Sequence, residues 1–137
     1  MKEKWEHRSL CSGVEEKYSI TLIDYYTATR ELRFNVILSS PGHRLIVSFV
    51  VSSSYSTYIG PLRNNRIREL EKRLGKGFFH EKIFFEATNS DFLKWIYEDS
   101  CTISEGLKLK HFCFVDNRMF LDIATMTEEP EIKKIPH

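Results

Sequence analysis

The hydrophobic residues in the first half of this chain largely follow the pattern of β-strands. Strands are predicted at residues 18–26, 31–38 and 44–52. In the second of them, apolar residues occupy every second position from Leu32 to Leu38, as expected for a strand with one exposed face. The first is rich in β-branched and aromatic residues, and the third is apolar on both faces. Polar turns between them predict an antiparallel meander.

The last part of the chain has the pattern of a β-hairpin, residues 107–127, with a polar turn at Asp116–Arg118. Its strands are apolar on both faces, so we expect the hairpin to form the middle of a sheet. An acidic tail follows it, with Glu128, Glu129 and Glu131. We interpret this tail as a solvent-facing edge suited to a basic partner.

Two segments have helical periodicity. Residues 61–76 begin with Pro61 near the first helical position, carry apolar residues at helical spacing and reach a stop at Gly75. Residues 91–99 follow a cluster of N-cap residues and are predicted to bury Phe92, Trp95 and Ile96. The remaining segments are predicted as a short helix or ordered arm at residues 1–17, a linker at 52–60, a strand at 82–87 and a loop at 101–106.

The order of these elements predicts an α+β fold. Helices that come after a run of hairpin-linked strands favour an antiparallel sheet of about five to six strands, with two or three helices packed mainly on one face. We find no internal repeat and no low-complexity linker, so residues 1–137 are predicted to form a single domain.

Composition narrows the classes of function. Twenty basic and nineteen acidic residues give a formal net charge of +1, so there is no general attraction to nucleic acid or membranes. The three cysteines have irregular spacing, which favours reduced thiols, and no segment has the length of a membrane span or the pattern of a signal peptide. We therefore expect a cytoplasmic protein, and no motif in the sequence indicates a cofactor.

Candidate reactive groups are few. His111 and Cys113 lie two residues apart on one predicted strand and therefore on one face. They suggest two metal ligands or a nucleophile with its base, but no further ligand motif or orienting carboxylate can be placed. We interpret them as core residues and predict neither a catalytic nor a metal site. The sequence does not show how far apart the carboxylates of Asp24, Asp116 and Asp122 lie, so no acid–base pair can be assigned among them.

The helix at residues 61–76 carries six basic residues and two acidic ones. A solvated helix face is the simpler interpretation; the functional one is a basic surface in which Arg66 and Arg73 contact phosphates or an acidic protein. Tyr55 and Tyr58, in the adjacent predicted linker, are side chains of the kind that anchor protein interfaces.

Residues 111–132, HFCFVDNRMFLDIATMTEEPEI, carry a likeness to known proteins. A histidine flanked by an aromatic residue, a short turn, a Leu-Asp-Ile strand and a Glu-Pro-x-Ile tail make this segment resemble immunity proteins of bacterial toxin systems. The resemblance covers about a fifth of the chain. It implies a protein that blocks a toxin by covering it, and it transfers no catalytic residue.

The leading hypothesis is thus a cytoplasmic protein-binding module, an immunity protein that binds a cognate toxin domain. Its predicted partner-binding residues are Tyr55, Tyr58, Arg66, Arg73, Glu128, Glu129 and Glu131. The alternative is an accessory domain that binds nucleic acid through the basic helix, and a third hypothesis is a small enzyme that uses His111. The sequence leaves the oligomeric state open.

Overall fold

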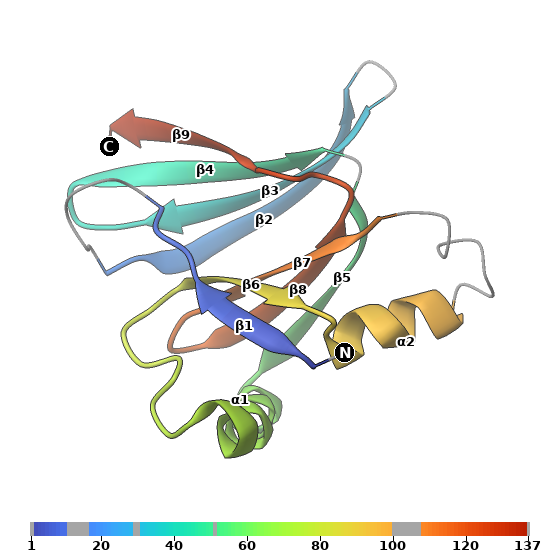
Figure 1. Ribbon diagram of the computed structural model, residues 1–137. Coiled ribbons are helices and arrows are strands. Elements are labelled where there is room, and N and C mark those ends of the chain that lie inside the picture. The colour runs from blue at the N-terminus through green and yellow to red at the C-terminus, as the bar shows by residue number, and fades with distance from the viewer. Residues whose placement is uncertain (1, 11–16, 29–30, 51, 100–107, 137) are drawn as a thin grey trace.

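The computed structural model has two antiparallel sheets that face each other, with two helices on the outer side of one of them (Figure 1). It describes residues 2–10, 17–28, 31–50, 52–99 and 108–136. The strands are β1 (Lys4–His7), β2 (Ser19–Ala28), β3 (Glu31–Ser39), β4 (His43–Val50), β5 (Ser52–Ile59), β6 (Phe84–Thr88), β7 (Lys110–Val115), β8 (Met119–Thr125) and β9 (Glu131–Pro136). The helices are α1 (Pro61–Leu74) and α2 (Asp91–Asp99).

The five-stranded sheet has the order β1-β6-β7-β8-β5, with every neighbouring pair antiparallel. The hairpin of β7 and β8 is therefore central, as predicted. The four-stranded sheet has the order β2-β3-β4-β9, so the predicted meander is also confirmed. The final strand β9 pairs with β4 and forms one edge of this second sheet.

The main core lies between the two sheets. Large apolar side chains of β3 and β4, such as Phe34 and Phe49, pack against Phe112, Phe114 and Leu121 of the central hairpin. The alternate residues of the same hairpin form a second core beneath the helices. The central hairpin is apolar on both faces because the second sheet covers one face and the helices cover the other.

The predicted α+β fold, with one antiparallel sheet of about five to six strands and two or three helices on one face, is wrong. Among the described residues the fold is mostly β, with nine strands in two sheets and only two helices. Three segments account for the difference: residues 52–60, predicted as a linker, contain β5, the acidic tail leads into β9, and the arm contains β1. Their short or polar sequences give weak strand signals, and pairing with a neighbouring strand decides their conformation.

Both helices occur where they are predicted. Pro61 is at the start of α1, and the backbone N–H of Gly75 donates to the carbonyl of Glu71 at its end. In α2 the hydroxyl of Ser90 accepts the N–H of Leu93, which is an N-cap interaction. The prediction that Trp95 is buried is wrong: its side chain is 55% exposed, and Leu93 is buried in its place.

Candidate functional site

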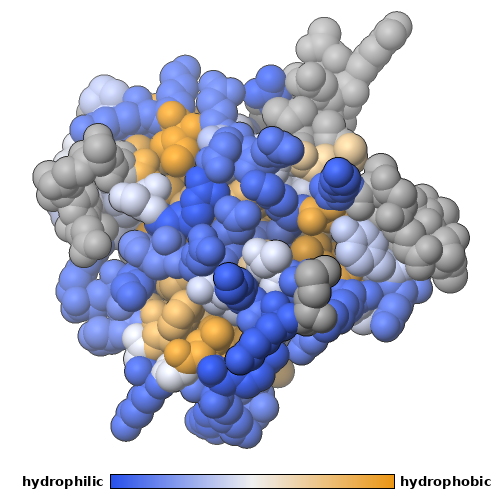
Figure 2. All heavy atoms as spheres, viewed as in Figure 1, coloured by the Kyte–Doolittle hydropathy of each residue, from blue (hydrophilic) through white to orange (hydrophobic). Residues whose placement is uncertain are grey.

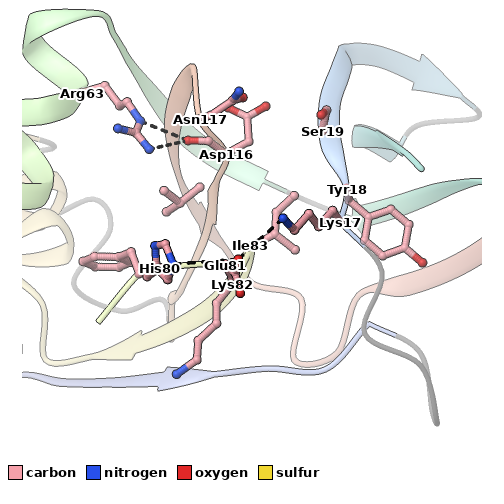
Figure 3. Close-up of a pocket in the computed structure, with 12 residues that line it drawn as sticks. Lys17, Tyr18, Ser19, Arg63, His80, Glu81, Lys82, Ile83, Asp116 and Asn117 are labelled. Carbon is pink, nitrogen blue, oxygen red and sulfur yellow. Dashed lines mark hydrogen bonds and ion pairs between the residues drawn. The ribbon is translucent and has the colours of Figure 1, made fainter. Parts of the chain in front are cut away.

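A cleft of about 420 Å³ opens at the end of the sandwich where β2 begins and β7 turns into β8 (Figure 3). We call it the end cleft. It is lined by Lys17, Tyr18, Ser19, Arg63, Phe79, His80, Glu81, Lys82, Ile83, Val115, Asp116 and Asn117. These residues come from both sheets, from α1 and from the segment between α1 and β6, so only the tertiary fold assembles the cleft.

One wall of the end cleft is held by Asp116. Its carboxylate accepts the backbone N–H groups of Arg118 at 2.9 Å and Met119 at 2.7 Å, which closes the hairpin turn. The same carboxylate accepts the N–H of Ile20 at 2.9 Å and so joins the two sheets. Arg63 donates from Nε and Nη2 to the Asp116 carbonyl at 3.0 and 2.7 Å. These bonds fix α1, β2 and the central hairpin relative to one another.

The rim of the end cleft carries charges of both signs. Lys17 approaches Glu81 at 3.6 Å and the ring of His80 approaches the same carboxylate at 3.9 Å. These side chains are largely exposed, so their ion pairs contribute little to stability. The rim of mixed charge thus surrounds an interior that includes apolar residues such as Phe79 and Ile83.

Exposed apolar residues lie in the segment that leads to Arg63. Ile59 is 60% exposed and Leu62 is 64% exposed, the largest exposed fractions among the described large apolar side chains. Ile59 pairs with Met119 directly after the hairpin turn, which places it at the same end of the sheet as the cleft. Elsewhere, on the face that Figure 2 shows, apolar areas are separated by hydrophilic residues.

A buried polar network crosses the five-stranded sheet on its helix side. His111 lies 2.8 Å from the Ser90 hydroxyl through Nδ1 and 2.6 Å from Asp122 through Nε2. Both oxygens of Asp122 accept Arg66 Nη2 at 3.3 Å. With Asp122 ionised beside Arg66, we assign the histidine proton to Nε2, and the Ser90 hydroxyl then donates to Nδ1. The network ties α1 and α2 to the central hairpin.

This network has the serine–histidine–aspartate connectivity of hydrolase triads. A nucleophile must contact substrate, yet Ser90, His111 and Asp122 each have 0% of their surface exposed. Ser90 also caps α2. The arrangement in this structure is therefore a structural one that satisfies buried polar groups.

His111 and Cys113 are buried on the same face, as predicted for core residues. Burial raises the pKa of the Cys113 thiol well above its ordinary value, the nearby Asp122 carboxylate raises it further, and Arg66 opposes both effects. The thiol thus stays protonated, which opposes nucleophilic reaction. Cys11 and Cys101 lie outside the described residues.

The two tyrosines predicted to bind a partner point to opposite faces of the sheet. Tyr55 is 47% exposed, and its ring lies 4.8 Å from that of Phe34 on the side of the second sheet. Tyr58 lies on the helix side, where the Arg66 guanidinium is 5.5 Å from its ring centre. They therefore do not share one contact surface.

The two arginines predicted to bind a partner already have protein partners. Burial disfavours the charge of Arg66, but Asp122 more than offsets this, so the pKa of Arg66 is raised. Arg73 forms an ion pair with Glu3 and lies 3.7 Å from Asp91. The Arg66 side chain is 20% exposed and the Arg73 side chain is 49% exposed, so Arg73 keeps part of its surface open to solvent beside its acidic partners.

Of the acidic residues of the predicted edge, Glu128 and Glu129 lie on the connection from β8 to β9, and Glu131 is the first residue of β9. Glu129 accepts a hydrogen bond from Arg8, which lowers the pKa of Glu129. The backbone carbonyl of Glu128 accepts Lys110 Nζ at 3.1 Å. Glu131 is exposed.

The end cleft was not predicted from the sequence. The polar turn at residue 116 is the one local sequence feature that marks its position.

The structure was also searched for metal sites and for helices that could cross a membrane. Within the part of the chain that the structure describes, no group of three or more His, Cys, Asp or Glu side chains is arranged to hold a metal ion. No helix in those residues is both long enough and apolar enough to cross a membrane. Comparison with protein-family models, curated proteins and solved structures finds no match to this chain.

Proposed function

We propose that this chain is a protein-binding domain, and specifically an immunity protein that binds a cognate bacterial toxin and blocks it. The end cleft is the observation that carries the proposal. It combines a recess of about 420 Å³ with apolar residues inside and charges of both signs at its rim. Leu62, which is 64% exposed, precedes Arg63 of the cleft in the chain and provides an apolar contact beside it.

The chemistry of the cleft favours a protein as its ligand. A phosphate or nucleic-acid site requires cations directed at the ligand, whereas Arg63 donates to a backbone carbonyl and Lys17 faces Glu81. A protruding side chain or loop of a partner protein suits the apolar interior, and polar atoms of that partner suit the rim. Binding of this kind blocks a toxin by occlusion and needs no reactive group.

The resemblance to immunity proteins supports the end cleft as the binding surface. Residues 111–132 resemble immunity proteins, and this segment contributes Val115, Asp116 and Asn117 to the end cleft. Because Asp116 also holds the two sheets together, the cleft is preorganised, and preorganisation lowers the entropy cost of binding.

The test is coexpression with toxin domains encoded beside the gene of this chain. We expect an equimolar complex that inhibits the toxin. Leu62→Arg replaces an exposed apolar contact with a charge, and Lys82→Glu reverses a charge of the rim. Each is expected to weaken binding by about tenfold, the effect of losing roughly 1.4 kcal/mol at an interface.

A matched control is Lys134→Glu, a charge reversal at an exposed position of β9, which lies at the opposite edge of the four-stranded sheet from β2. It is expected to leave inhibition unchanged. If all three variants protect equally, the end cleft is not the interface. If no neighbouring toxin is bound or inhibited by the unchanged chain, the proposed function is wrong.

A further inference from the structure

Helix α2 carries a tryptophan on its outward face. Phe92, Leu93 and Ile96 of this helix belong to the core beneath it and are each 7% exposed. Trp95 is 55% exposed, and its ring lies 6.4 Å from that of Phe92 on the same helix. Tryptophan is highly buried on average in folded proteins and is enriched at protein interfaces. Its exposure here therefore marks a surface suited to contact with another molecule.

Carboxylates flank Trp95 on the same face of α2. Asp91 lies about one helical turn before it and Glu98 about one turn after it, so the three side chains are neighbours on the helix surface. The Asp91 side chain is 68% exposed, with Lys94 at 3.9 Å and Arg73 at 3.7 Å from its oxygens. Glu98 is also exposed. Three acidic residues and one basic residue give α2 a formal charge of −2.

The acidic end of α2 opposes the stability of the helix itself. Its last turn contains Glu98 and Asp99 and no basic residue. The carbonyl groups at a helix C-terminus carry partial negative charge, so carboxylates there are unfavourable and cations are favourable. Helix α1 has the favourable arrangement, with Lys72 and Arg73 in its last turn. A cation bound at the end of α2 would thus relieve a repulsion that the folded chain retains.

We propose that the outward face of α2 binds a basic segment of another protein, with an arginine of that segment stacked on Trp95 beside Glu98. The face of an indole ring attracts cations more strongly than that of other aromatic side chains, and a planar guanidinium also stacks on it. The carboxylate of Glu98 and the C-terminal end of the helix attract the same cation.

The charge of α2 selects the class of partner. Nucleic acids and anionic membranes present phosphates, which the acidic residues of α2 repel, whereas a basic protein segment is attracted. None of the residues that line the end cleft belongs to α2. The proposal therefore concerns a separate surface and does not rest on the proposed toxin binding.

Titration of the full chain with a blocked oligoarginine peptide, followed by nuclear magnetic resonance, tests the location of this surface. The indole N–H signal of Trp95 and the backbone amide signal of Glu98 are expected to shift. The indole signal of Trp5, which is 7% exposed, is expected to stay in place. An oligolysine peptide of equal length is expected to bind roughly two- to fivefold more weakly, because an ammonium group does not stack on the indole ring.

Substitutions on α2 test the contacts themselves. Trp95→Ala is expected to weaken binding of the oligoarginine peptide by roughly two- to fivefold, the effect of an exposed cation–π contact. Glu98→Gln is expected to weaken it by roughly twofold. Glu131→Gln, which removes an exposed carboxylate of β9, is the matched control and is expected to leave binding unchanged. Circular dichroism establishes that each variant is folded.

Three results would each overturn the proposal. The first is a titration in which the Trp95 and Glu98 signals do not move. The second is equal binding of the oligoarginine and oligolysine peptides, which would mean attraction by charge alone. The third is an equal loss of binding in Glu98→Gln and Glu131→Gln, which would mean that the peptide has no preferred position on the chain.

Discussion

A large loss of stability is expected from Asp122→Asn, which keeps the size of the side chain but removes its charge. Asp122 is fully buried, and its oxygens lie 3.3 Å from the Arg66 guanidinium. At this distance two unit charges attract by ~5 kcal/mol at an effective dielectric constant of ~20. The Arg66 side chain is 20% exposed and regains some hydration. We therefore expect a loss of about 3 kcal/mol, the lower end for breaking a buried ion pair.

The loss of stability arises mainly because the Arg66 charge stays buried without its carboxylate partner. A double variant that removes both charges tests this. In the double variant Arg66→Met with Asp122→Asn no unpaired buried charge remains. The asparagine oxygen can still accept the Nε2–H of His111, and the methionine can still pack against Phe120. We expect the double variant to be about 1–2 kcal/mol more stable than Asp122→Asn alone, since apolar replacement of both partners is often tolerated.

The assay is equilibrium unfolding in urea at pH 7, followed by circular dichroism. Asp122→Asn is expected to lower the midpoint without changing the slope, because the slope reports the surface exposed on unfolding. Glu69→Gln is the control, since Glu69 forms an exposed ion pair with Lys72. It is expected to leave the midpoint unchanged. A loss below about 1 kcal/mol for Asp122→Asn, or no recovery in the double variant, would refute this reasoning.

Two further predictions concern the buried thiol and a turn glycine. Because burial and the nearby Asp122 raise the pKa of Cys113, alkylation at pH 7–9 followed by peptide mass mapping is expected to modify it only after unfolding. Below the unfolded thiol pKa of about 8.5 both the folded and the unfolded chain keep the thiol proton, and the stability contribution is complete. Above that pH only the unfolded chain releases the proton, so the free energy of unfolding falls. Rapid labelling of the folded chain would contradict this. Gly60→Ala is expected to cost about 1–3 kcal/mol in urea unfolding, since Gly60 has φ 61° and ψ −131°, which strain an L residue. Gly42→Ala is the control, with no atom within 4 Å of the added Cβ, and an equal loss at both positions would contradict the role of backbone strain.

The elements with strong local patterns are predicted correctly from the sequence. Alternation in β3, the two-sided apolar character of the central hairpin and the Pro61 and Gly75 signals of α1 each depend on neighbouring residues alone. The burial of His111 also follows, because its strand is apolar on both faces. A residue buried in that position needs hydrogen-bond partners, but the sequence does not say which residues they are.

The tertiary structure alone decides how these elements combine. The polar sequence of β5 becomes a strand because β8 offers it backbone partners, and β9 forms because β4 does. Arg66 and Arg73 have the pattern of a basic surface in the sequence, but both meet acidic residues from distant parts of the chain. The end cleft likewise joins residues from Lys17 to Asn117. Periodicity reports which face of an element is apolar, whereas contacts between distant residues depend on how the two sheets pack, and no local pattern contains that information.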